Sequence, residues 1–112
     1  MVVDQDLSDA QVDRLFHALA DRTRRDILRR TLVAKPTVSE LAALYPMSFA
    51  AVQKHVSVLE GAGLVTKQNS GRTRIVRADP ETIARAERLL DSYTELWRDR
   101  VARLDAMLAD EN

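Results

Sequence analysis

Basic side chains are concentrated in the middle of this chain. Between residues 22 and 77 there are eleven lysines and arginines but only three acids, although the whole sequence carries 17 residues of each sign. The flanks are acidic, and from residue 79 onward nine acids accompany five arginines. A basic centre between acidic ends is typical of a polyanion-binding surface carried on a separate scaffold. Ordinary solvated charge is the alternative explanation.

The residues from 48 onward have the composition of a helix that reads DNA. An α-helix fits the major groove, and the N-terminal residues of the second helix in a helix-turn-helix touch the base edges. Gln53 can pair bidentately with adenine, Lys54 can reach guanine or phosphate, and Phe49 with Ala50 can contact thymine methyl groups. For His55, a phosphate contact and a purely structural role at the border of the buried stripe both stay open. The expected DNA-binding residues of this helix are Ser48, Phe49, Ala50, Gln53, Lys54 and His55.

A β-hairpin is predicted directly after this helix. Residues 64–66 and 73–76 have the pattern of two short strands, and residues 68–71 are typical of a turn. Lys67, Arg72 and Arg74 are expected to reach the DNA backbone or the minor groove, while Thr73 and Ile75 face the other way.

Enzyme chemistry is not expected. The chain has no cysteine, two histidines and no phosphate-cradling glycine loop, so it lacks a nucleophile-base pair and a cofactor site. Two acidic arrangements are candidate ion sites: Asp13 with His17, one helical turn apart, and the row Asp91, Glu95 and Asp99. Neither is assigned a metal, because a surface or interface role explains the first and neighbouring arginines offset the charge of the second.

The elements that position these residues are mostly helices. Ser8, Asp21, Thr37 paired with Glu40, and Ser48 are candidate N-caps, and residues 38–44 and 48–61 form two helices separated by a turn. Asp79 followed by proline starts a last helix that runs to about residue 109. The sequence therefore predicts a mainly α, single domain over residues 1–112 with one small hairpin, in which residues 37–77 form the helix-turn-helix and its wing.

The last helix carries an apolar seam that needs a partner. Its apolar residues recur at steps of three and four, as in a coiled coil, and residues 80–108 at 1.5 Å rise span roughly 44 Å, too long for this domain to bury alone. The helices within residues 1–20 and 80–108 are thus expected to form a dimer. Tyr93 and Trp97 are also candidates to line a pocket for an organic effector, although packing is the simpler role. The expected dimer contacts are Leu15, Phe16, Leu19, Leu90, Tyr93, Trp97, Val101, Leu104 and Leu108.

Three segments give the sequence a specific resemblance. Residues 16–28 (FHALADRTRRDIL), 38–42 (VSELA) and 47–65, which contain VQKHV and LEGAGLV, resemble the ArsR family of bacterial repressors. The resemblance implies homodimers with a hairpin wing that release their promoter when an effector binds. The chain lacks the cysteines and last-helix histidines with which many members sense metals, and residues 96–104 resemble a cysteine-free branch for which metal sensing is not expected. Phe49, Ala50 and Gln53 depart from the family pattern, so the operator cannot be inferred from relatives.

These observations predict a homodimeric, sequence-specific repressor that binds double-stranded DNA at a palindromic operator. The alternative is a winged-helix module that binds proteins and does not read DNA. No cofactor is expected, a small-molecule effector is an expectation of the resemblance alone, and no membrane span or secretion signal is predicted, which places the chain in the bacterial cytoplasm.

Overall fold

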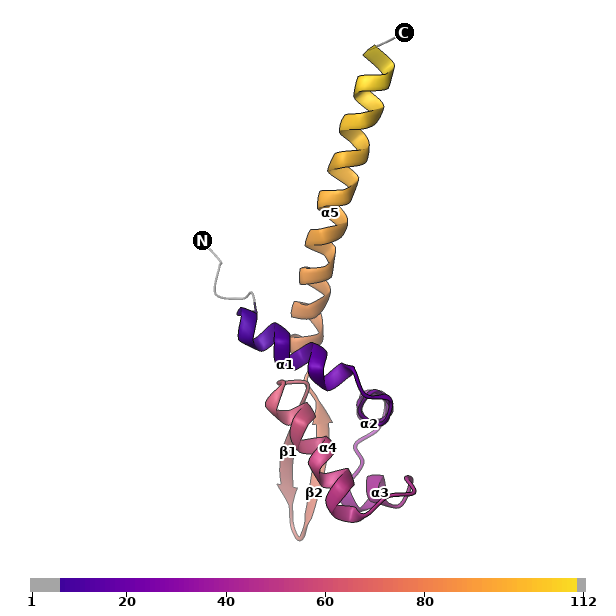
Figure 1. Cartoon of the computed structure of the whole chain (residues 1–112). Coiled ribbons are helices and arrows are strands. Elements are labelled where there is room, and N and C mark those ends of the chain that lie inside the picture. The colour runs from indigo at the N-terminus through magenta and orange to yellow at the C-terminus, as the bar shows by residue number, and fades with distance from the viewer. Residues whose placement is uncertain (1–6, 111–112) are drawn as a thin grey trace.

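A computed structural model describes residues 7–110, and Figure 1 shows a small helical body with a hairpin on one side and one long helix leaving it. Along the chain the elements are α1 (Asp9–Leu19), α2 (Arg22–Val33), α3 (Val38–Ala42), α4 (Phe49–Gly61), β1 (Val65–Ser70), β2 (Thr73–Ala78) and α5 (Pro80–Asp110). The predicted mainly α fold with a hairpin wing and a long C-terminal helix is confirmed.

The helix starts lie where the sequence predicted them. The Ser8 hydroxyl accepts from the amide of Gln11 and starts α1, and the Asp21 carboxylate accepts from the amide of Arg24 and starts α2. Thr37 and Glu40 form a reciprocal capping box in front of α3. Each cap satisfies a backbone donor that a helix N-terminus leaves unpaired. The third helix ends at Ala42, two residues earlier than predicted.

The core is built from α1 to α4 and the hairpin. Its apolar side chains recur at helical spacing on each helix and at the inner face of the strands, and the largest fully buried ones are Leu15, Ile27, Leu41, Val52, Val56, Leu59, Leu64, Val65 and Val76. From α5 only the first turns take part: Thr82 is buried, and Ile83 and Ala86 pack against the core.

The hairpin is longer than predicted, and its turn lies further along the chain. Ser70 pairs with Thr73, which leaves Gly71 and Arg72 as the two-residue turn. Gly71 has φ 62°, the positive value that the first turn residue of a type II′ hairpin requires. The predicted turn at residues 68–71 was wrong because Gln68, Asn69 and Ser70, although typical turn residues, continue the cross-strand pairing. The amide of Val76 also donates to the carbonyl of Pro36 at 2.9 Å, which fixes the hairpin to the start of α3.

Most of α5 is exposed within the described residues 7–110. Figure 1 shows it projecting away from α4 and the hairpin, and every residue from 90 to 110 is exposed. Its 31 residues explain the elongated shape, which measures 71 × 35 × 24 Å. Within residues 7–110, no helix combines the length and the apolar character that a membrane span requires.

Candidate nucleic-acid interface

The helix α4 divides cleanly into a buried and an exposed face. Val52, Val56 and Leu59 are buried in the core, whereas Ala50, Gln53 and Lys54 are exposed on the other side of the helix. The sequence-predicted contacts of this helix, with the exception of His55, thus lie on its solvent-facing N-terminal half.

The start of α4 is held by Ser48. Its hydroxyl accepts from the amide of Ala51 at 3.1 Å, and its carbonyl accepts from the amide of Val52. Phe49, the first residue of the helix, is exposed despite its size. A capped helix start with exposed polar and apolar side chains can approach both a phosphate and the floor of a DNA groove.

His55 is held within the protein. Its Nδ1 lies 3.2 Å from Nη1 of Arg24 and accepts a hydrogen bond, because a guanidinium can only donate. Arg24 also donates to the carbonyls of Ala18 at 2.8 Å and His17 at 2.9 Å, at the end of α1. The two residues therefore join α1, α2 and α4. This contact favours the structural role that the sequence left open for His55.

The hairpin presents its three expected basic residues differently. Lys67 lies beside Val76 on the inner face, where its Nζ is 3.5 Å from a carboxylate oxygen of Glu60 on α4 and its side chain is only 12% exposed. Lys67 thus faces α4 in the structure, and its expected DNA contact stays a prediction. Arg72 is exposed in the turn, and Arg74 is exposed while donating to the side chain of Asn69 at 3.3 Å. The tip of the hairpin, with Arg72 and Arg74, is its basic end.

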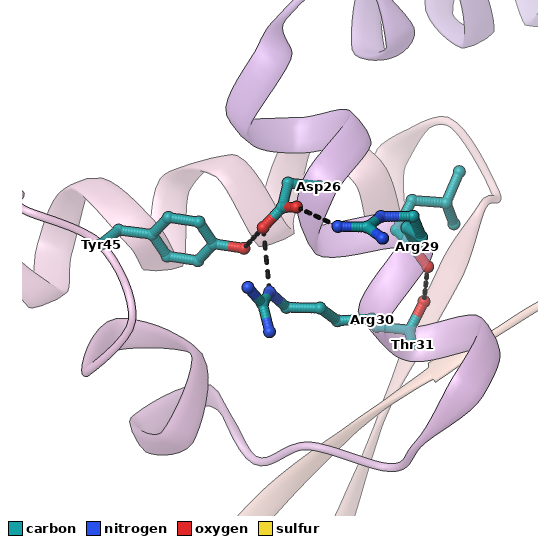
Figure 2. Close-up of polar contacts among 6 residues, drawn as sticks. Asp26, Arg29, Arg30, Thr31 and Tyr45 are labelled. Carbon is teal, nitrogen blue, oxygen red and sulfur yellow. Dashed lines mark hydrogen bonds and ion pairs between the residues drawn. The ribbon is translucent and has the colours of Figure 1, made fainter.

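A polar cluster, which the sequence did not predict, ties α2 to the turn in front of α4. Figure 2 shows Asp26 at its centre: the hydroxyl of Tyr45 donates to Asp26 at 2.6 Å, and Arg30 and Arg29 donate at 2.9 and 3.0 Å. The Tyr45 hydrogen bond, followed by those from Arg30 and Arg29, lowers the pKa of Asp26 well below its ordinary value of 3.8. Burial, assisted by the carboxylate, raises the pKa of Tyr45. Asp26 is therefore a carboxylate and Tyr45 a neutral donor around neutral pH.

A second surface lies on α5 and α1. The predicted seam residues of α5 are all exposed, and Trp97 is 61% exposed. The guanidinium of Arg100 lies over its ring, 5.8 Å from the centroid. On α1, Phe16 is exposed and Leu19 is half-buried. Leu15 is only 1% exposed because this side of α1 packs into its own core, and its expected contact with a partner stays a prediction. Two exposed residues absent from the predicted seam, Leu96 and Met107, widen the apolar surface of α5.

The two candidate ion sites lie on exposed helix surfaces. Asp13 and His17 lie exposed on α1, and the Asp91, Glu95 and Asp99 row lies exposed on α5. Within residues 7–110, no three histidine, aspartate or glutamate side chains are grouped so that they could hold a metal ion.

Comparison with known proteins gives consistent results. A family described as a helix-turn-helix domain matches residues 19–68. The HTH-type transcriptional regulator Rv2034 of Mycobacterium tuberculosis is 40% identical over 81 residues, which cover 72% of this chain and 76% of that protein. An ArsR-like transcriptional regulator from Rhodococcus sp. RHA1 superposes with a TM-score of 0.80 and 31% identity, over 90% of this chain and 93% of that one. The homodimeric winged helix-turn-helix DNA-binding domain of Mb0332 from Mycobacterium bovis superposes with a TM-score of 0.63 and 25% identity, over 80% and 88% of the two chains.

Proposed function

Since this chain belongs to the ArsR family of winged helix-turn-helix transcriptional regulators, we propose that it is a homodimeric repressor that binds a palindromic operator in double-stranded DNA. Each protomer places the N-terminal half of α4 in the major groove and the tip of the hairpin on the neighbouring backbone or minor groove. Such a regulator works on the bacterial chromosome and hence in the cytoplasm.

The observation that carries this proposal is the exposed face of α4. Gln53 and Lys54 stand on the side opposite Val52 and Val56, directly behind a capped helix start. Gln53 is suited to pair with adenine, and Lys54 to bind guanine or a phosphate. Phe49 and Ala50 are the apolar residues available to thymine methyl groups.

Dimerisation is supported by the apolar surface of α5. Leu90, Tyr93, Trp97 and Leu104 are about half exposed or more in the single chain, and apolar surface of this extent marks an interaction site. A second copy offers the same seam, as a two-fold symmetric interface requires. The homodimeric relative from Mycobacterium bovis supports the same assembly. Release of DNA by a small-molecule effector stays an expectation from the family resemblance.

Selection of DNA from a random-sequence pool tests the proposal. The wild-type protein should enrich a palindrome whose half-sites lie about 34 to 36 Å apart, one turn of DNA. Gln53→Ala should lose preference at one base pair of each half-site, at a cost of about 1–3 kcal/mol. Transcription in vitro from a promoter overlapping this palindrome should fall when the protein is added.

Two results would overturn the proposal. If Lys54→Ala and Arg72→Ala both bound the enriched duplex as well as the wild type, the assigned face would be wrong. If the dimer enriched no duplex at all, a winged-helix module that binds proteins would be the better description.

A further inference from the structure

A basic cleft lies between α2 and the turn that precedes α4. Its volume is about 720 Å³, and its walls include Arg22, Arg25 and Arg29 on one side and Tyr45 and Met47 on the other. None of these residues belongs to the α4 face or the hairpin tip described above. The sequence indicated only that these arginines belong to the basic centre of the chain. Their spacing does not reveal that they lie next to the turn in front of α4.

The side chains that line this cleft carry a net positive charge. Four arginines line it, Arg30 being the fourth, against the single acid Asp26, which leaves a net charge of four minus one, or +3. Asp26 already accepts hydrogen bonds from Tyr45, Arg29 and Arg30. Its carboxylate is therefore engaged inside the cluster, and the remaining positive charge faces the open cleft.

Arg22 has no evident structural role. It is the first residue of α2, where the helix dipole disfavours a positive charge, and the first turn of α2 contains no acid. Its side chain is exposed and, within residues 7–110, has no hydrogen-bond or ion-pair partner in the structure. By contrast, Arg25 donates to the carbonyl of Leu19 at 2.7 Å and thereby caps α1. An exposed arginine at the start of α2 is available to a ligand outside the chain.

The three outer arginines share one face of α2. Arg22, Arg25 and Arg29 are separated by three and four residues, which places them in one row about 10 Å long. The side chain of Arg29 is 75% exposed even though it donates to Asp26. The row thus presents several free guanidinium donors, the groups best suited to phosphate oxygens.

The position of the cleft identifies the ligand. Met47 in its wall is followed directly by Ser48, the N-cap of α4. We propose that Arg22, Arg25 and Arg29 bind phosphates of the operator backbone beside the stretch that α4 reads, as a contact separate from α4 and the hairpin tip. This inference rests on the proposed function, and it assigns α2 a role in positioning the protein on DNA.

The salt dependence of binding tests this contact. The probe is the duplex that the wild-type protein enriches from a random-sequence pool, titrated at several salt concentrations with the full-length dimer. Each lost phosphate contact should lower the slope of log affinity against log salt by about one unit, so Arg22→Ala should lower it by about two in the dimer. Arg29→Ala should act in the same way, and Arg22→Lys should keep most of the slope. The melting temperature of Arg22→Ala should stay equal to or slightly above that of the wild type.

Arg98→Ala is the matched control, because it removes an exposed arginine from α5, which projects away from α4. Suppose that the Arg22 and Arg29 variants bound DNA with the same affinity and salt slope as Arg98→Ala, whereas Lys54→Ala bound more weakly and with a lower slope. The inference would then be overturned, and the proposed function would stand. If the wild-type protein enriched no duplex, the proposed function itself would fail and this inference with it.

Discussion

Nη1 of Arg24 lies 3.2 Å from Nδ1 of His55, and this contact links α2 to the middle of α4. Both residues carry groups that suit a phosphate, yet they face each other and not the solvent. Arg24 uses its other nitrogens on the last carbonyls of α1. The pair therefore sets the angle between α4 and the scaffold that carries it.

Replacing Arg24 should weaken the fold. Arg24→Ala removes two hydrogen bonds to the end of α1 and one to His55, so the free energy of unfolding should fall by about 2 kcal/mol. Urea unfolding followed by circular dichroism at one fixed dimer concentration measures this loss. Arg98→Ala, an exposed arginine on α5, should change the value by no more than about 0.5 kcal/mol. Equal stability of the two variants would show that the Arg24 contacts do not hold the helices together.

The hydrogen bond from Tyr45 to Asp26 should contribute to stability through the turn in front of α4. Tyr45→Phe keeps the ring and removes the donor, which should cost about 1 kcal/mol. In a double-mutant cycle with Asp26→Ala, the two losses should add up to more than the loss in the double variant, because one change removes the donor and the other the acceptor of the same contact. Additive losses would mean that the two side chains act independently.

The lowered pKa of Asp26 makes this contribution depend on pH. The carboxyl titrates near 3.8 in the unfolded chain and well below 3.8 in the folded one. A group of this kind stabilises the fold above the unfolded pKa, and the contribution is lost as the pH falls through the window between the two values. The difference in unfolding free energy between the wild type and Asp26→Asn should therefore be largest around neutral pH and shrink steadily below about pH 4. Asp99→Asn serves as the control, and an Asp26→Asn difference that stayed constant with pH would contradict the assignment.

The sequence predicted most of the fold because its signals are local. Capping residues, the spacing of apolar residues on each helix, and Pro80 at the first position of α5 depend on neighbours within one or two turns. The length of the hairpin was mispredicted, since the pairing of Asn69 with Arg74 depends on the register of two strands and not on the turn propensity of asparagine.

The candidate site was predicted less completely, because side-chain direction depends on tertiary packing. Alternation along β1 places Lys67 on one face but does not reveal that Glu60 of α4 lies opposite it. The contact between Asp26 and Tyr45 joins residues 19 positions apart, and no periodic pattern indicates it. The position of Leu15 in the sequence fits both an interface residue and a core residue. Only the packing of α1 on α2 and α4 shows that its side chain lies in the core.

Arg72 and Lys67 offer a direct test of which basic residues of the hairpin contact DNA. Arg72→Ala removes an exposed charge at the turn and should lower the salt slope of DNA binding by about one unit for each protomer. Lys67→Ala should leave the slope almost unchanged, because its ammonium group is turned toward Glu60 and mostly covered. Titrations of both variants on the enriched duplex measure the difference. If the salt slope fell equally in the two variants, Lys67 would contact DNA as Arg72 does.

The seam of α5 should control both assembly and DNA binding. Leu104→Asp places a charge in the apolar surface, and burying an unpaired carboxylate against a second copy costs enough to dissociate the dimer. Sedimentation velocity should show a monomer, and affinity for the palindrome should fall steeply because two linked half-site contacts become independent. Glu95→Ala, on the charged side of the same helix, should remain dimeric and keep its affinity. Since residues 90–110 are all exposed, the Leu104 variant should also retain the folded core. A dimer that persisted in this variant would show that α5 does not form the interface.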